Sequence, residues 1–216
     1  MILNNIWSNP FDNSIAAAFS RFFTKLPPLI QEAIMAFSAL GNLGIFIILV
    51  GILLLIPKNT RKIGIICLLS IIFAGLINDL CIKESFARAR PYMDPELVPR
   101  CPSLITLSDG TVIPPGITPG NKSFPSGHTF ESFSIIGAMV FTYIFDKENK
   151  KTNLCFMIFF ILFGIAMGLT RILLTHHYAT DVIAGALLGF SCGIGIYYLI
   201  KYVPVLFKKL KKNEEK

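Results

Sequence analysis

Five long apolar blocks restrict what this chain can fold into more than any other feature of its sequence. Residues 34–56, 154–169 and 182–200 contain no charged side chain, residues 63–80 reach Asp79 only near their end, and residues 130–145 carry Glu131. A helix of about 20 apolar residues crosses the roughly 30 Å hydrocarbon core of a bilayer. In lipid only helices and closed barrels satisfy their backbone hydrogen bonds, and these blocks lack the alternation of barrel strands. The sequence therefore predicts an all-α fold, a polytopic membrane helix bundle with five to six transmembrane helices.

The first 33 residues differ from these blocks. Polar residues come before any long apolar run, and no cleavage pattern of a signal peptide follows them. Residues 15–25 combine small and aromatic side chains with Arg21 and Lys25, so the stretch is too short and too charged for a span. We expect residues 1–33 to form an N-terminal interfacial amphipathic segment. A transmembrane domain over residues 34–202 and a basic cytoplasmic tail over residues 203–216 follow it.

The charge of the chain agrees with this organisation. Only 15% of the residues are charged, against about a quarter in soluble domains. The net charge of +7 is concentrated in lysine- and arginine-rich segments at residues 58–62, 147–151 and 201–216. Short segments of this kind face the cytoplasm. If the chain crosses the membrane five times, the three basic segments all lie on the same side of the membrane. The charge therefore indicates topology, and we expect the bilayer, not nucleic acid, to be the partner.

The connections on the other side include one long loop, residues 83–124, which is rich in proline and glycine. Such a composition opposes regular helix, and long loops in compact domains are usually functional. The cysteines lack the spacing of a metal site. Cys81 and Cys101 both fall on this outer side, where a disulfide is chemically permitted, and their pairing is left open.

Polar residues gather at the outward ends of three expected helices. The candidate residues are Lys83, Arg90, Ser126, Gly127, His128, Arg171, His177 and Asp181. Charge bias and motif position, two independent features, put all of them on the same membrane face. We therefore expect one cationic, histidine-containing site there.

These residues form three motifs: Lys83-x6-Arg90-Pro91, Pro125-Ser126-Gly127-His128 and Arg171-x5-His177-x3-Asp181. In this order and at these spacings the chain, over about residues 34–200, resembles the type-2 phosphatidic acid phosphatase superfamily. That superfamily includes lipid phosphate phosphatases, undecaprenyl diphosphate phosphatases, bacterial phosphatidylglycerophosphatases and vanadium haloperoxidases. The chain departs from the family pattern at Thr170, where a serine is usual, and in its five expected spans, where six are common.

The resemblance implies that His177 is a nucleophile that forms a phosphohistidine and that His128 is a general acid. Asp181, four residues after His177, would share its helix face and hold one ring nitrogen, which leaves the other free to attack. No metal or other cofactor is expected, because basic residues supply the positive charge.

The residue types suit the binding of phosphate. Arg90 and Arg171 offer planar forks of donors that match phosphate oxygens, and Lys83 adds a point charge. Ser126 and Gly127 begin a helix after Pro125, and a helix N-terminus is a ready anion site in which glycine allows close approach. We expect these five residues to hold the phosphate of the substrate.

Several residues have a second interpretation. Lys83 can simply mark a helix end and pair with Asp79, and Arg88 can be either a further site residue or a solvated one. His176 points elsewhere on a helix from its neighbour, and the role of Glu131 is left open.

The resemblance thus implies a membrane phosphatase acting on a lipid phosphate monoester or a polyprenyl diphosphate such as undecaprenyl diphosphate. Its site would face outward from the plasma membrane, and its oligomeric state is left open. Vanadate-dependent oxidation is the first alternative, but haloperoxidases are soluble and longer. A transporter would place polar residues at mid-membrane, and an inactive scaffold would be expected to lack a reacting residue.

Overall fold

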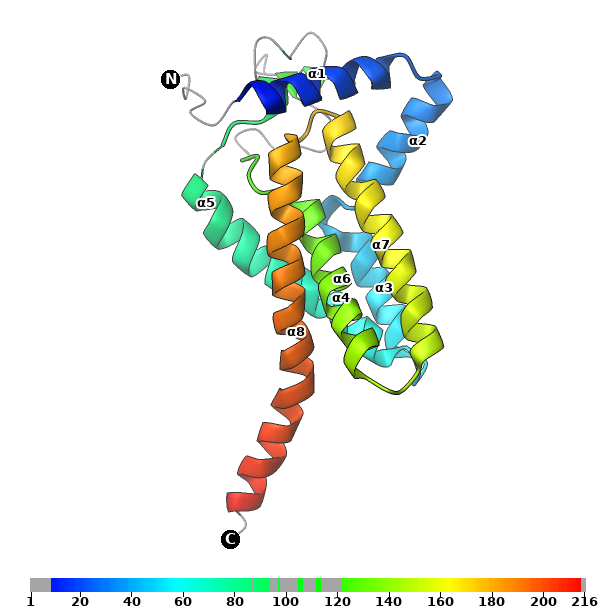
Figure 1. Ribbon diagram of the computed structural model, residues 1–216, viewed down its shortest axis with the longest axis vertical. Coiled ribbons are helices and arrows are strands. Elements are labelled where there is room, and N and C mark those ends of the chain that lie inside the picture. Colours follow the sequence, from blue (N-terminus) through cyan, green and yellow to red (C-terminus); the bar gives the residue numbers. More distant parts are fainter. Residues whose placement is uncertain are drawn as a thin grey trace.

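The computed structural model describes residues 9–86, 88–93, 97, 105–106, 112–113 and 122–214, which form a helix bundle (Figure 1). The helices are α1 (Pro10–Thr24), α2 (Pro28–Ala39), α3 (Ile45–Leu55), α4 (Arg61–Phe73), α5 (Lys83–Phe86), α6 (Gly127–Phe145), α7 (Lys150–Leu173) and α8 (Ala179–Glu214). Short 3-10 segments, η1 (Asn42–Gly44) and η3 (Pro91–Met93), and a π-helical segment, η2 (Ala74–Ile82), connect some of them. A short antiparallel pair, β1 (Ile105–Thr106) and β2 (Val112–Ile113), lies in the expected outer loop.

Among the described residues, three helical stretches are long and apolar enough to cross a membrane: Arg61–Met93, Lys150–Leu173 and Ala179–Leu206. They contain the second, fourth and fifth predicted blocks. The third block forms α6, which packs against α4, α7 and α8 and buries much of its surface. The predicted membrane helix bundle is confirmed, with α6 at its centre.

The first predicted block, residues 34–56, is not one continuous helix. It is divided between α2 and α3, because Gly44 adopts a left-handed conformation with φ of 63°. A side chain is strained in that conformation, and a Cβ at Gly44 would also lie 2.8 Å from Ile71 Cδ1. The glycine therefore allows the chain to turn between two short helices.

Helix α1 lies across one end of the bundle (Figure 1). Its first turn is capped by Asn9, whose side-chain oxygen accepts the amide of Asp12 at 2.8 Å. One face buries Asp12 and Phe23, whereas Phe11 and Phe22 are exposed on the other. The amphipathic pattern expected of this segment is present, but its buried face docks on α7 and α8.

Helices α6 and α8 form the closest pair in the bundle. A Cβ at Gly189 would lie 2.2 Å from the carbonyl oxygen of Phe130, and a Cβ at Gly193 would lie 2.0 Å from that of Ser134. Small residues let two backbones approach in this way. This contact fixes the start of α6 beside the start of α8, where the candidate site lies.

Candidate active site

The candidate residues come together at the end of the bundle that α1 covers (Figure 1). They lie at the N-termini of α6 and α8, at the C-terminus of α7 and after η2. Arg90, Ser126, Arg171, His177 and Asp181 are all buried. The charges of Lys83, Arg90 and Arg171 act on both His128 and His177. These side chains therefore form one cationic site.

His177 lies in the turn before α8, not within the helix as the sequence predicted, because α8 begins at Ala179. Its Nδ1 is 2.7 Å from the carbonyl oxygen of Ser123. A carbonyl oxygen only accepts hydrogen bonds, so Nδ1 carries the proton and Nε2 keeps its lone pair. Arg90 Nη1 donates toward Nε2 at 3.1 Å. The nitrogen with a lone pair for nucleophilic attack is therefore Nε2, which accepts a hydrogen bond from the Arg90 guanidinium in this structure.

Asp181 does not bind His177 directly, which corrects the predicted contact. Its Oδ2 lies 3.7 Å from His177 Nδ1, too far for a hydrogen bond. That carboxylate is already engaged, because Oδ2 accepts the Ser123 hydroxyl and the amide of Tyr178, and Oδ1 accepts Arg88. Ser123 links the two residues, since its hydroxyl donates to Asp181 and its carbonyl oxygen accepts from His177.

Burial lowers the pKa of His177 well below its ordinary value of 6.5, and the nearby charges of Arg90, Arg171 and Lys83 lower it further. Burial and then Arg171 also lower the pKa of the neighbouring His176 well below that value. Both imidazoles are therefore neutral near pH 7. A neutral ring is the form in which His177 Nε2 can attack phosphorus.

The two arginines are held differently. Arg90 donates to the carbonyl oxygens of His176 at 2.9 Å and of Lys122 at 3.3 Å. Arg171 donates from Nη1 to the hydroxyl of Ser38 in α2 at 2.7 Å, and its buried Nε has no partner within the described residues. A buried guanidinium with an unused donor suits a phosphate oxygen.

Lys83 pairs with Asp79, as its second interpretation expected, and its ammonium also lies near the start of α6. Its Nζ pairs with Asp79 at 2.7 Å. The same ammonium faces the start of α6, since a Cβ at Gly127 would lie 3.3 Å from it. Gly127 therefore leaves room for a cation at a helix N-terminus.

Ser126 is occupied by protein contacts. Its amide donates to the carbonyl oxygen of Asp181 at 3.0 Å, and its hydroxyl lies 3.0 Å from Thr129 Oγ1. The first amides of a helix have no partner within that helix. At the start of α6 the amides of Gly127 and His128 are therefore the donors best suited to an anion.

His128 lies against η1. Its Nε2 is 3.3 Å from Asn42 Oδ1, and a Cβ at Gly41 would come within 2.1 Å of its ring. Gly41 thus makes space for the imidazole. Glu131, one turn further along α6, is half-buried.

Arg88, which the sequence left undecided, is buried. It forms ion pairs with Asp12 and Asp181 at 2.7 and 2.5 Å and lies over the ring of Tyr178. Arg88 is therefore not solvated, and it connects Asp181 of the site to Asp12 of α1. Cys81 is a free, exposed cysteine in this structure, and Cys101, with which a disulfide was left open, lies outside the described residues.

The PAP2 superfamily model matches residues 63–204, about two thirds of the chain, and this range contains every candidate residue. The chain belongs to the PAP2 superfamily. The predicted resemblance is therefore confirmed.

Several known proteins are similar to this PAP2 chain. Lipid phosphate phosphatase 2 of Arabidopsis thaliana is 29% identical over 63% of this chain and 49% of its own length. Bacitracin transport permease protein BcrC of Bacillus licheniformis is 32% identical over 44% of this chain and 42% of its own. The chain spans about half the length, or less, of these curated relatives.

A crystal structure of a transmembrane PAP2-type phosphatidylglycerolphosphate phosphatase from Bacillus subtilis has the same fold. The two structures superpose with a TM-score of 0.59 over 88% of this chain and 86% of the Bacillus subtilis chain, and their sequences are 22% identical. The helix bundle described above is therefore a known PAP2 architecture.

Sequence reasoning missed four supporting residues: Asp12, Ser38, Asn42 and Ser123. The first three precede the range of the PAP2 match, residues 63–204. They reach the site only because α1, α2 and η1 fold back onto it. Ser123 lies three residues before Ser126 and supplies a backbone carbonyl, which leaves no mark on a sequence pattern.

Proposed function

We propose that this chain is an integral membrane phosphatase that cleaves a phosphate ester or diphosphate of a lipid through a phosphohistidine on His177. The observation that carries the proposal is the fixed tautomer of His177. Its Nδ1 is held by the Ser123 carbonyl oxygen at 2.7 Å, and its Nε2 lies 3.1 Å from Arg90. A neutral imidazole with one oriented lone pair beside a buried guanidinium suits attack on an anionic phosphoryl group.

The reaction has two steps. In the first, the Nε2 lone pair of His177 forms a bond to phosphorus and the bond from phosphorus to the leaving oxygen breaks. His128, protonated in the complex with the anionic substrate, gives that oxygen a proton. In the second, a water molecule that loses its proton to His128 attacks phosphorus, the bond from nitrogen to phosphorus breaks, and inorganic phosphate leaves. Arg90, Arg171 and Lys83 stabilise the charge on the equatorial phosphoryl oxygens, so the proposal assigns no step to a metal.

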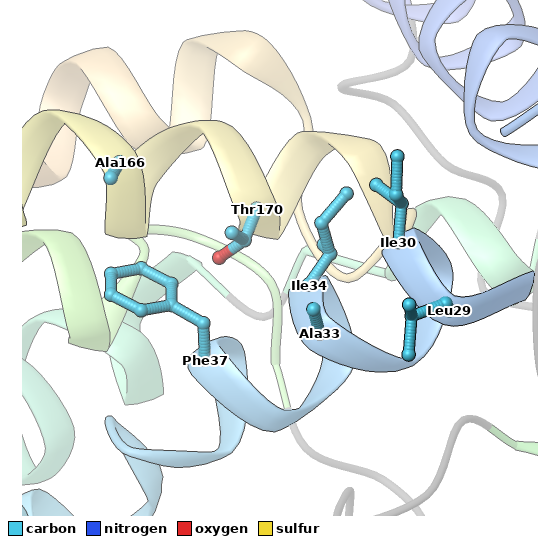
Figure 2. Close-up of a pocket in the computed structure, with 7 residues that line it drawn as sticks. All are labelled: Leu29, Ile30, Ala33, Ile34, Phe37, Ala166 and Thr170. Atoms are coloured by element: carbon cyan, nitrogen blue, oxygen red, sulfur yellow. The ribbon is translucent and has the colours of Figure 1, made fainter. Parts of the chain in front are cut away.

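An apolar groove supports a lipid as the substrate. The groove lies between α2 and α7 and has a volume of about 530 Å³ (Figure 2). It is lined by Leu29, Ile30, Ala33, Ile34, Phe37, Ala166 and Thr170. Thr170 directly precedes Arg171, and Phe37 directly precedes Ser38, the hydrogen-bond partner of Arg171. The hydrogen bond between Arg171 and Ser38 therefore joins the two helices that form the groove, next in sequence to two of its lining residues. A phosphate at Arg171 with its hydrocarbon chain in the groove fits this arrangement.

The sidedness and the substrate belong to the same proposal. The lysine- and arginine-rich segments at residues 58–62, 147–151 and 201–216 favour the opposite, cytoplasmic side, so the site would face outward. The name of the Bacillus subtilis enzyme favours phosphatidylglycerolphosphate as the first substrate to test. The family resemblance of the motifs adds phosphatidate and undecaprenyl diphosphate.

The test measures inorganic phosphate released from each of these lipids by the purified protein in EDTA. We expect turnover of at least one lipid in EDTA, and its loss in His177→Ala at an unchanged thermal unfolding midpoint. His176→Gln, which changes the adjacent imidazole, should retain measurable turnover. Full activity in His177→Ala, or no release from any phosphorylated lipid, would contradict the proposal.

A further inference from the structure

Helix α1 contributes a carboxylate, Asp12, that contacts Arg88 and Thr180 next to the candidate site. Asp12 lies in its first turn and has an exposed fraction of 0%. Its Oδ2 accepts Arg88 Nη2 at 2.7 Å and Thr180 Oγ1 at 2.6 Å, and its Oδ1 accepts the amide of Thr180 at 3.1 Å. Burying a charged side chain costs free energy unless the charge is paired. The burial of Asp12 is therefore not explained by an interfacial position of α1 alone.

These contacts connect Asp12 to the start of α8. Thr180 is the second residue of that helix, so its amide is one of those that the helix leaves unpaired. Asp12 therefore acts as a cap supplied by another helix, and its negative charge suits the positive end of the α8 dipole. The capped turn directly follows His177.

Arg88 extends the connection to the nucleophile. Its Nη1 donates to Asp181 Oδ1 at 2.5 Å and to Thr180 Oγ1 at 2.7 Å. Asp181 in turn accepts the hydroxyl of Ser123, whose carbonyl oxygen holds Nδ1 of His177. A continuous series of buried polar contacts thus runs from α1 to the ring whose free nitrogen would attack.

We propose that Asp12 is a positioning residue for His177, acting through Arg88, Asp181 and Ser123. This inference rests on the proposed function for its catalytic consequence. Asp12 lies outside residues 63–204, the range that the family model matches, so a helix beyond that range contributes to the site. With Asp12 neutral, Arg88 is no longer held from two sides, and removing one partner of a buried ion pair leaves the other charge uncompensated.

The test compares Asp12→Asn with a matched control, Asp146→Asn, in the whole chain in detergent. Asp146 also forms an ion pair, with Lys62, but it lies just beyond the opposite end of α6. Hydrogen exchange of the amides of residues 175–182 reports the order of the turn, whether or not the protein hydrolyses a lipid. We expect faster exchange there in Asp12→Asn and no change there in Asp146→Asn.

Steady-state kinetics on the lipid that the wild type hydrolyses give the second readout. Asp12→Asn should lower kcat by about 10- to 100-fold with little change in KM, because a misplacement of about 1 Å can cost about 100-fold. Asp146→Asn should keep the wild-type kcat.

Unchanged exchange in residues 175–182 would overturn the inference, whatever the activity. A second outcome would also overturn the inference: exchange becomes faster in every helix, and kcat falls only in proportion to the fraction of folded protein. Asp12 would then be a general stabilising contact. Failure of the proposed function would give a different result from failure of this inference. The wild type would release no phosphate from any lipid, whereas hydrogen exchange in residues 175–182 would still become faster in Asp12→Asn.

Discussion

His176 and His177 lie side by side in the turn between α7 and α8, and both imidazoles are buried in a cationic site. Burial lowers the pKa of each ring below 6.5 in the folded state. At these two residues the unfolded chain therefore binds more protons than the folded chain as the pH falls through 6.5. Their contribution to the free energy of unfolding decreases over that range, because stability rises with pH wherever the unfolded state binds more protons.

Replacing His176 isolates part of this effect. Thermal unfolding of the wild type and of His176→Gln can be followed in detergent between about pH 8 and 5, the range in which an ordinary histidine titrates. We expect the unfolding midpoint of the variant to fall less between these limits, because one group that gains a proton on unfolding is gone. Parallel pH dependence in the two proteins would show that His176 binds protons equally in the folded and unfolded states, against the lowered pKa.

The residue types of the site could be predicted from the sequence, but their contacts could not. The three motifs identified His177 and Arg171 because imidazole and guanidinium chemistry suits phosphate. The partner of His177 Nδ1 is a backbone carbonyl, and that of Arg171 is Ser38, which is remote in the sequence. Neither contact follows from motif spacing, since one depends on a loop conformation and the other on a helix that folds back.

At the scale of elements, the contact between α6 and α8 sets the site because it aligns two helix N-termini. Gly193→Ala should destabilise the protein, since the new Cβ would lie 2.0 Å from the carbonyl oxygen of Ser134. Overpacking of this kind typically costs about 1–3 kcal/mol. Gly195→Ala is the matched control on the same helix, because a Cβ there has no atom within 4 Å.

The two glycine variants are expected to move in opposite directions. Alanine is favoured over glycine in a helix by up to about 1 kcal/mol, so Gly195→Ala should raise the thermal unfolding midpoint or leave it unchanged. Equal midpoints for Gly193→Ala and Gly195→Ala would contradict the close approach of α6 and α8.

The groove between α2 and α7 gives a prediction about substrate length. Ala166→Phe places a ring in the groove, whereas Leu162→Phe changes an exposed residue on the same helix. Excluding about two methylene groups, at about 0.8 kcal/mol each, should lower kcat/KM for long-chain lipid phosphates roughly tenfold.

A short-chain phosphate ester distinguishes the groove from a general defect. Its kcat/KM should be nearly the same in wild type, Ala166→Phe and Leu162→Phe, because its chain does not reach the groove. An equal loss on short and long chains in Ala166→Phe would mean that the hydrocarbon chain binds elsewhere.

At the scale of the whole molecule, length and hydropathy predicted the bundle because the bilayer imposes both on a spanning helix. They did not predict that α2 and α3 are separate, which follows from the left-handed Gly44. They also predicted only an interfacial α1, because the burial of Asp12 depends on Arg88 and Thr180, which lie far along the chain. Local patterns thus gave the spans, and non-local contacts completed the site.

Trapping the covalent intermediate on His177 would establish the nucleophile of the reaction. The wild-type protein is mixed with a lipid carrying radiolabelled phosphate, the reaction is quenched in alkali, which preserves phosphohistidine, and the label is mapped by peptide mass spectrometry. We expect a phosphoryl group on Nε2 of His177 that is lost in acid and absent from His177→Ala. Phosphate release by the wild type with no label on the protein, or with the label on another residue, would contradict this expectation.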